Sequence, residues 1–472
     1  MSTTPLRREG LTAVVGIGRS GSGAARLLHR EGHRVCVIDS ADDAEQRRRA
    51  EQLRQLGIEA RLGIPLEAKA LDSLGPQLER LILSPGIRWD HPAVEDLRRR
   101  GVRVDGELVP AWEASRPVPW IGITGTNGKT TVTHLVHHLL NSNGIDAPMA
   151  GNVGLSAAEL VLERLSAPEG LPQWMVVELS SYQIEAAQVV APRVGLWTTL
   201  TPDHLERHGS LEAYRAIKRS LLEHSAVRLL NADDPDLRRH ADSWPGAHWV
   251  SAGPRQALPP SIQPLLWIER GRIWQERGGH AHDLMDATCL QMPGQHNLQN
   301  MLLAAAVGLE AGLDGPSMER AFRLFQGVPH RLERIEVLEG ITYYNDSKAT
   351  NYDAAVVAVR ALEGPLVVLA GGQAKLGEAR QWLDALRQKA LAVVLFGAAR
   401  ERFGTLLQQA GFAGVVHHCE GLEDAVPLAR QAAESLACRA VLLSPACASF
   451  DQYSDFEARG NHFRELVLNL KT

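Results

Sequence analysis

The sequence has few of the features that mark secreted, zinc-binding, membrane-spanning or nucleic-acid-binding proteins. It has 5 cysteines in 472 residues and no Cys-x-x-Cys pair, so we expect neither a disulfide framework nor a zinc site. No run reaches the roughly 18 apolar residues of a membrane span. Lys+Arg 50 against Asp+Glu 55 leaves a formal charge of −5, without the cationic excess of a general nucleic-acid binder. We therefore expect a soluble, cytoplasmic monomer that binds neither membranes nor nucleic acid.

Short β-branched runs alternate with Ala/Leu/Arg-rich stretches along nearly the whole chain. This alternation is typical of βαβ units on parallel sheets, and the length suits three domains of about 150 residues each. Breaks near Pro117 and Gly327 predict α/β domains at 1–115, 116–327 and 328–472, with a more β-like insert at 246–295. Strands are predicted at 13–16, 34–38, 81–83, 120–124, 174–177, 194–200, 366–370, 392–396 and 440–443, and helices at 21–30 and 94–100.

The most informative stretch is a strand, a glycine-rich loop and a helix in immediate succession. Gly122, Gly125 and Gly128 let successive backbone N–H groups turn toward one anion, and the start of the helix adds a partial positive charge. Lys129 suits the β- and γ-phosphates of a nucleotide, and the Thr130 hydroxyl is a hard ligand that suits Mg²⁺. The stretch therefore predicts a phosphate-binding loop.

This loop departs from the standard spacing at one position. The pattern G-x-x-x-x-G-K-[ST] places a glycine at position 123, where the chain has Ile123 between Gly122 and Gly125. A phosphate loop alone also leaves kinase, ATPase, GTPase and ligase activities open.

A second glycine-rich turn lies near the N-terminus. Gly16, Gly18 and Gly21 complete a G-x-G-x-x-G pattern after a strand, and Asp39 ends the next strand. Alone, this is the fingerprint of a dinucleotide site, which makes an NAD-dependent oxidoreductase a rival hypothesis. The same turn suits another diphosphate, such as the UDP of a nucleotide sugar. The arginine run at 47–49 is interpreted as a solvated helix face.

Nine segments spread over nearly the whole chain share a further pattern. They are residues 122–131, 151–154, 178–183, 203–204, 214–218, 294–300, 329–331, 345–351 and 444–452. Together they resemble the Mur ligase family, which builds the peptide of bacterial peptidoglycan precursors. The last two segments resemble the branch that adds D-glutamate, and the Asp-Asn-Pro-Arg motif of the diamino-acid-adding branch is missing from the sequence.

The resemblance implies an α/β fold of three domains: a Rossmann-like UDP-binding domain, a central P-loop ATPase domain and a Rossmann-like domain that binds the amino acid. It also implies that ATP, bound between the second and third domains, phosphorylates the carboxylate of UDP-N-acetylmuramoyl-L-alanine, and that the amine of D-glutamate attacks the acyl phosphate. The alternatives are another Mur ligase, a folylpolyglutamate-synthase-like ligase and, more remotely, the oxidoreductase. A protein that only binds its ligands would turn over no nucleotide.

The resemblance also assigns roles to individual residues. The catalytic set is Lys129, His204 and Lys218. The ATP set is Gly125, Thr126, Asn127, Gly128, Lys129, Thr130 and Thr131, with Asn297, Asn300, Arg331, Asp346 and Lys348 across a cleft from the loop. The UDP-substrate set is Arg19, Ser20, Asp39, Ser40, Gly86 and Asn152, although Ala41 stands where the family often has an arginine. The D-glutamate set is Thr350, Lys375, Ser449 and Phe456.

The Mg²⁺ ligands implied by the resemblance are Thr130, Glu178, His204 and Lys218. Glu178 fits this role because it ends an apolar strand, and ligands gather at the carboxyl ends of parallel strands. Lys218 is implied to react with CO₂ and form an anionic carbamate. Only a neutral amine adds CO₂, so Lys218 would need a lowered pKa, which burial can supply. Without the resemblance, Lys218 beside Arg219 in a helix would be interpreted as a surface lysine.

Overall fold

The computed structural model describes residues 10–292, 294–374 and 377–471. The chain divides into two compact units, Met1–Leu290 with Gln295–Phe325, and Gln291–Gly294 with Gln326–Thr472. The first unit contains two sheets and the second contains one.

The N-terminal sheet is parallel throughout and has the order β3-β2-β1-β4-β5. Its strands are β1 (Leu11–Val15), β2 (Arg34–Ile38), β3 (Glu59–Arg61), β4 (Leu78–Leu83) and β5 (Arg103–Gly106). Its helices are α1 (Arg19–Arg30), α2 (Ala44–Gln55), α3 (Ala68–Asp72), α4 (Pro92–Arg99) and α5 (Leu108–Ala114). Side chains of α1, α2 and α5 pack on one face, and those of α3 and α4 on the other. The strand order reverses between β1 and β4, which is where open α/β sheets bind ligands.

The central sheet has the order β14-β13-β12-β11-β10-β9-β6-β8-β7. Its strands are β6 (Trp120–Thr124), β7 (Met149–Gly151), β8 (Met175–Glu178), β9 (Val194–Trp197), β10 (Val227–Asn231), β11 (His248–Ser251), β12 (Pro264–Glu269), β13 (Arg272–Arg277) and β14 (His280–Asp286). The first seven are parallel, and β13 and β14 add an antiparallel edge. The predicted insert at 246–295 is therefore mostly a continuation of this sheet, because β11 pairs directly with β10.

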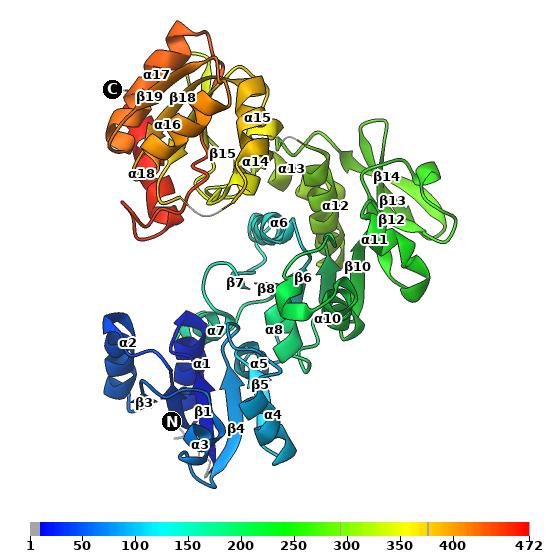
Figure 1. The fold of residues 1–472 in the computed structure, drawn as a ribbon. Coiled ribbons are helices and arrows are strands. Elements are labelled where there is room, and N and C mark those ends of the chain that lie inside the picture. Colours follow the sequence, from blue (N-terminus) through cyan, green and yellow to red (C-terminus); the bar gives the residue numbers. More distant parts are fainter. Residues whose placement is uncertain (1–9, 293, 375–376, 472) are drawn as a thin grey trace. The chain divides into compact units, whose positions relative to one another are not determined.

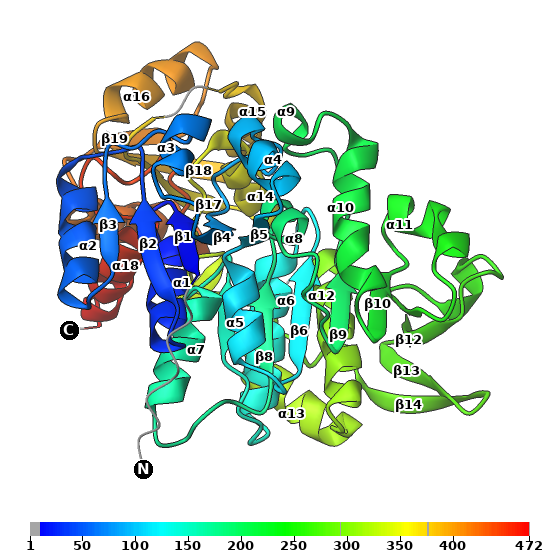
Figure 2. The ribbon, with the colours of Figure 1, turned by 90° about the horizontal axis from the view of Figure 1, so that it is seen from below.

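The helices of the central domain include two that begin with reciprocal capping boxes, Ser156 with Glu159 and Ser180 with Gln183. They are α6 (Lys129–Asn141), α7 (Ala157–Ser166), α8 (Ser181–Ala186), α9 (Leu205–His208), α10 (Leu211–Glu223), α11 (Pro235–Arg239), α12 (Gln295–Glu310) and α13 (Gly315–Leu324). Helices α1 and α7 lie side by side in both ribbon views (Figures 1 and 2), and their buried residues share one core. The N-terminal and central domains are thereby joined within the first unit.

The second unit is a six-stranded sheet of order β15-β16-β20-β17-β18-β19. Its strands are β15 (Glu333–Leu338), β16 (Ile341–Asn345), β17 (Leu366–Gly371), β18 (Ala390–Phe396), β19 (Val415–His418) and β20 (Ala440–Leu443). Its helices are α14 (Tyr352–Ala361), α15 (Arg380–Lys389), α16 (Arg400–Gln409), α17 (Leu422–Ser435) and α18 (Phe456–Asn469). Only β15 runs antiparallel to its neighbour, and helices cover both faces of the sheet.

Several predicted elements have the expected bounds, among them the strands at 34–38, 120–124 and 440–443. The helix predicted at 21–30 begins earlier, at Arg19, and the strand predicted at 194–200 ends at Trp197. All five cysteines are buried and free, so the prediction of no disulfide is confirmed. Among the described helices, none has both the length and the apolar character needed to span a bilayer. The domain boundaries at 115 and 327 stay predictions.

Candidate active site

The loop between β6 and α6 has a shape that only glycine permits at two positions. Gly125 has a φ of 148°, and a Cβ there would lie 1.9 Å from the Thr198 hydroxyl. Gly128 has a φ of 85° at the start of α6, and its Cβ would lie 2.8 Å from the Asn300 side-chain oxygen. Both contacts are closer than real Cβ atoms allow, so the loop owes its path to these glycines.

The loop is also fastened to the segment that follows β9. The Thr126 amide donates to the Thr199 carbonyl over 2.8 Å, and the Asn127 amide donates to the Thr199 hydroxyl over 3.0 Å. Ile123 does not disturb this loop because it is still a buried residue of β6, paired with Leu196 and Glu178 in the neighbouring strands. The turn itself begins two residues later, at Gly125.

Two lysines converge on this loop from different helices. Lys129 folds back and its Nζ donates to the carbonyls of Gly125 and Thr126, over 2.9 Å in each case. Lys218, on α10, donates from Nζ to the same Gly125 carbonyl over 3.0 Å and to the Thr124 hydroxyl over 3.3 Å. Thr130 and Thr131 are buried in the first turn of α6. The predicted catalytic lysines therefore meet at one carbonyl oxygen.

Lys218 is 1% exposed, and its Nζ lies 4.5 Å from the centroid of the Tyr214 ring. Burial lowers the pKa of the Lys218 ammonium well below its ordinary value, the positive charge of Lys129 lowers it further, and Asp203 acts in the opposite direction. The side chain is thus biased toward the neutral amine. The interpretation as a surface lysine, which the sequence alone favours, is wrong.

Glu178 ends β8 and is buried beside the loop strand. Its Oε1 accepts a hydrogen bond from the Asn152 side-chain amide over 2.9 Å, whereas its Oε2 is buried and accepts none from the described residues. A buried carboxylate oxygen without a donor is costly, and a cation would compensate it. This atom therefore fits a divalent metal ion. Asn152, predicted on the UDP side, contacts Glu178 here.

His204 has a φ of 53° and precedes α9, with its side chain partly exposed. Its Nε2 lies 3.5 Å from an Asp203 carboxylate oxygen, and its Nδ1 lies 3.7 Å from a Glu206 carboxylate oxygen. The ring lies 5.3 Å from that of Tyr182. Across the three described ranges, no three His, Cys, Asp or Glu side chains are grouped so that they could hold a metal by themselves. The predicted ligand set therefore depends on hydroxyl and lysine groups as well.

The asparagines predicted on the ATP side lie on α12 in the first unit. Asn297 and Asn300 are both buried, and the Asn300 amide donates to the Asn297 side-chain oxygen over 3.4 Å. Asn300 also packs directly against Gly128. The expectation that these two residues lie across a cleft from the loop is wrong, because α12 packs against α6 and places Asn300 at the loop itself.

The N-terminal glycine turn lies at the switch point of its sheet. Asp39 fastens it, since one carboxylate oxygen accepts from the Ile17 amide over 2.8 Å and the other from the Ala41 amide over 2.9 Å. The remaining residues of the predicted UDP set follow the carboxyl ends of β1, β2 and β4 and are exposed or half-buried; they are Arg19, Ser20, Ser40 and Gly86. These residues therefore share one edge of the sheet.

The second unit brings together most residues predicted for ATP and D-glutamate there. Asp346 is buried after β16, and its carboxylate accepts from the Leu332 amide and the Ser444 hydroxyl, each over 3.1 Å. Burial raises the pKa of Asp346 to about 7, although both hydrogen bonds and Arg331 act in the opposite direction. The Arg331 Nε is buried and has no hydrogen-bond partner in the described part of the chain.

Lys348 links these residues to the predicted amino-acid site, because its Nζ lies 5.6 Å from the centroid of the Phe456 ring at the start of α18. Thr350 follows on the same segment and is half-buried, and Ser449 is buried. Lys375 lies outside the described residues.

Comparison with known proteins decides the family. Residues 11–106 match the description "Mur ligase MurD-like, N-terminal domain", residues 123–308 match "Mur ligase middle domain", and residues 330–447 match "Mur ligase, glutamate ligase domain". The chain is a Mur ligase. Membership confirms the predicted family and the three-domain α/β architecture, and it removes the basis for the oxidoreductase hypothesis.

Individual relatives of this Mur ligase are similar over almost its full length. A protein of Parasynechococcus marenigrum (strain WH8102) is 53% identical over 97% of this chain and 98% of its own. One of Synechococcus sp. (strain CC9605) is 52% identical with the same coverage. Both are named UDP-N-acetylmuramoylalanine--D-glutamate ligase. The solved UDP-N-acetylmuramate-alanine ligase of Thermotoga maritima shares the fold, with a TM-score of 0.56, 20% identity and coverage of 97% of this chain and 99% of that one.

Sequence reasoning missed two arginines near these sites. Arg49, assigned to a solvated face, is half-buried and donates from Nη1 to the Ile17 carbonyl of the N-terminal glycine turn over 3.4 Å. Arg459 is fully buried and donates to the Ser347 and Cys447 carbonyls over 2.8 and 3.1 Å. Burial lowers the pKa of Arg459 to about 10. The sequence shows Arg49 only as one member of a run of arginines. That run does not indicate which of its side chains points toward the glycine turn.

Proposed function

We propose that this Mur ligase joins D-glutamate to the L-alanine carboxylate of UDP-N-acetylmuramoyl-L-alanine and converts ATP to ADP and phosphate. The observation that carries the proposal is the full-length similarity to relatives named for this reaction. The site supports it, because Lys129 and the buried Lys218 both donate to one carbonyl of the phosphate loop, and Glu178, in the strand beside the loop strand, has a buried carboxylate oxygen without a donor among the described residues.

The substrate carboxylate and the γ-phosphate are both anions and repel each other, so positive charge in the site must offset this repulsion. We assign that charge in the first unit to Lys129 and to the N-terminus of α6. Gly125, Thr126, Asn127, Gly128 and Thr131 form the rest of the phosphate cradle, and Asn297 and Asn300 border it from α12. Arg331, Asp346 and Lys348 are assigned to ATP from the second unit.

Mg²⁺ would supply further charge neutralisation between the two anions. The residues that would hold it are Thr130, Glu178, His204 and a carbamate of Lys218. The carbamate forms when the neutral Lys218 amine attacks CO₂, makes a new N–C bond and releases one proton to solvent. An amine donor beside the loop is then replaced by an anionic oxygen ligand. The lowered pKa of Lys218 supports this step, since it increases the share of the side chain that is the reactive neutral amine.

The substrates are held at two other places in this proposal. Asp39, Arg19, Ser20, Ser40, Gly86 and Asn152 are assigned to the UDP substrate. Ser449, Thr350, Phe456 and Lys375 are assigned to D-glutamate, whose amine attacks the acyl phosphate and displaces phosphate. We also propose that the enzyme acts as a monomer in the cytoplasm, where ATP and nucleotide-linked precursors are available.

The test is ADP release from ATP in the presence of UDP-N-acetylmuramoyl-L-alanine and one acceptor at a time. We expect release with D-glutamate, and background release with L-glutamate, L-lysine or no acceptor. Equal release with any other acceptor, or none with D-glutamate, would refute the assignment of substrate while leaving the family intact.

A further inference from the structure

A carboxyl group that no assigned role uses is buried where the N-terminal and central domains meet. Glu107 follows β5 directly, is 3% exposed, and accepts a hydrogen bond on Oε1 from the Gln183 side-chain amide over 2.9 Å. Burial raises the pKa of Glu107 to about 7. A buried carboxyl group is costly, and its side-chain donor here is a neutral amide rather than a cation.

Gln183 has only one orientation that satisfies its neighbours. Its side-chain oxygen accepts from the Ser180 amide over 3.0 Å and from the Ser180 hydroxyl over 3.1 Å. Because a backbone N–H can only donate, the oxygen must face Ser180 and the NH₂ group must face Glu107. Ser180 lies two residues after Glu178, the residue whose free carboxylate oxygen fits a metal ion. Glu107 therefore contacts the segment that carries Glu178 through a single intermediate side chain.

The backbones at this junction are as close as glycine permits. A Cβ on Gly106 would lie 2.7 Å from the Ala186 Cβ and 3.0 Å from the Ala186 carbonyl oxygen. The end of β5 is thus pressed against α8, the short helix that Gln183 caps. Such a contact transmits a displacement instead of absorbing it, because packed interiors have little free volume.

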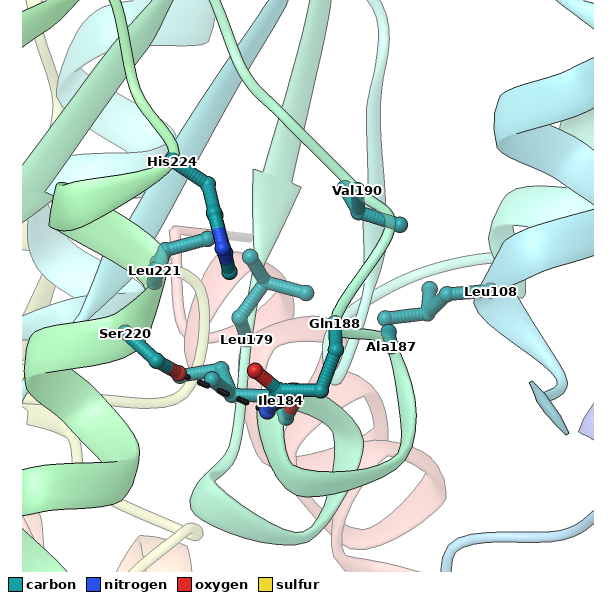
Figure 3. A pocket seen from close by; sticks show the side chains of 9 residues that line it. All are labelled: Leu108, Leu179, Ile184, Ala187, Gln188, Val190, Ser220, Leu221 and His224. Atoms are coloured by element: carbon teal, nitrogen blue, oxygen red, sulfur yellow. Dashed lines mark hydrogen bonds between the residues drawn. The ribbon is translucent and has the colours of Figure 1, made fainter.

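A small cavity lies at this junction of the two domains, and it is lined mostly by apolar side chains together with Gln188, Ser220 and His224. Figure 3 shows this cavity, in which Leu108 from the N-terminal domain faces Ala187 and Ile184 of α8 contributes to the lining. Leu179, which lies between Glu178 and Ser180, lines the same cavity. The residues that follow Glu107 and Gln183 in the chain, Leu108 and Ile184, therefore both line one cavity at the junction.

We propose that Glu107 is a positioning residue that couples the UDP-binding domain to the end of β8, so that the substrate carboxylate and the metal-side carboxylate of Glu178 are held in register. This inference rests on the proposed function, since it concerns the alignment of the UDP-linked substrate with Glu178. Misalignment by about 1 Å can cost roughly a hundredfold in rate without loss of binding. The coupling should consequently appear in kcat and not in the affinity for either substrate.

The experiment compares Glu107→Ala, Glu107→Asp and Glu107→Gln in the full chain. The first removes the acceptor, the second shortens it by one carbon, and the third keeps a side-chain oxygen in place for Gln183. The matched control is Arg30→Ala, because the exposed Arg30 joins the same two domains through Ser166 and the Leu165 carbonyl, at the end of α7 instead of at the segment 178–183. Readouts are kcat per folded enzyme, calorimetric affinities for ATP and for UDP-N-acetylmuramoyl-L-alanine, and melting temperature.

We expect kcat to fall roughly tenfold or more in Glu107→Ala and Glu107→Asp, with both affinities within about threefold of wild type. Glu107→Gln should stay within about threefold of wild type in kcat, and Arg30→Ala within about twofold. If Glu107→Ala does not fold, Glu107→Asp decides the question. The inference is overturned if the kcat of the decisive variant stays near that of wild type, or if Arg30→Ala loses as much. A wild-type enzyme without D-glutamate-dependent ADP release would instead refute the proposed function.

Discussion

The pH dependence of stability offers a quantitative check on the environment of Glu107. Its pKa is raised from 4.5 to about 7 by burial, although the Gln183 hydrogen bond and the adjacent amides oppose that rise. A raised carboxyl pKa means that the folded state holds the proton more tightly than the unfolded state does. The stabilisation is therefore complete below about pH 4.5 and is lost as the pH rises through about 7.

The magnitude follows from the difference in pKa. A rise in the carboxyl pKa from 4.5 to about 7 corresponds to about 3 kcal/mol of stabilisation, most of which is lost between about pH 5 and pH 8. For a unit of about 320 residues, the unfolding entropy scales to about 0.7 kcal/mol/K, so the loss equals roughly 4 °C in melting temperature. Glu107→Gln does not titrate. Its melting temperature relative to wild type should thus rise by about 4 °C over this interval.

The assay is a series of thermal melts of both proteins from about pH 5 to pH 8, with Asp236→Asn as control. The hydrogen bonds from Arg215 lower the pKa of Asp236 below 3.8, so its stabilisation is lost only as the pH falls below that range. The control difference should be flat from about pH 5 to pH 8. A flat or falling difference for Glu107→Gln would show that the Glu107 carboxyl is not held in its protonated form.

Three further substitutions test the sites directly. Lys218→Ala should lose at least about 99% of ligase activity, and short carboxylates such as formate should restore part of it; full activity without them would exclude the carbamate. Gly125→Ala should abolish the stabilisation of the protein by ATP, because the added Cβ would overlap Thr198. The control is Gly144→Ala, which is also at positive φ but faces open space and should keep that stabilisation. Both variants are measured by thermal shift. Arg49→Ala should raise the KM for the UDP substrate roughly tenfold, whereas Arg48→Ala, at the neighbouring exposed position, should leave this KM unchanged. Equal KM values for the two variants would show that Arg49 does not contribute to binding the UDP substrate.

Local patterns in the sequence predicted the parts of the molecule that are built from consecutive residues. The phosphate loop is one example, since the spacing of Gly125 and Gly128 reflects a backbone path that other residues cannot follow. The strand ends are another, because Glu178 and Asp39 each close an apolar run. Residues that follow parallel strands lie at one edge of the sheet, so their position can be predicted without information on tertiary contacts.

Contacts between elements that are distant in the chain could not be predicted from local sequence patterns. Lys218 is buried because α10 presents it toward β6, yet the composition around it is that of an exposed helix. Asn300 reaches the loop only through the packing of α12 on α6, and Arg49 reaches the glycine turn from a different helix. The Glu107–Gln183 hydrogen bond joins residues 76 positions apart. Periodicity cannot encode such pairs, because each depends on how whole elements pack.

The central claim is that the acceptor is D-glutamate, and one competition experiment tests it most directly. The enzyme is supplied with ATP, UDP-N-acetylmuramoyl-L-alanine and an equal mixture of unlabelled D-glutamate and ¹³C-labelled L-glutamate. The mass of the UDP-linked product is then measured by mass spectrometry. The account predicts a product that contains one unlabelled glutamate and forms in equal amount to ADP. A labelled product in comparable amount, or ADP without any glutamate-containing product, would contradict it.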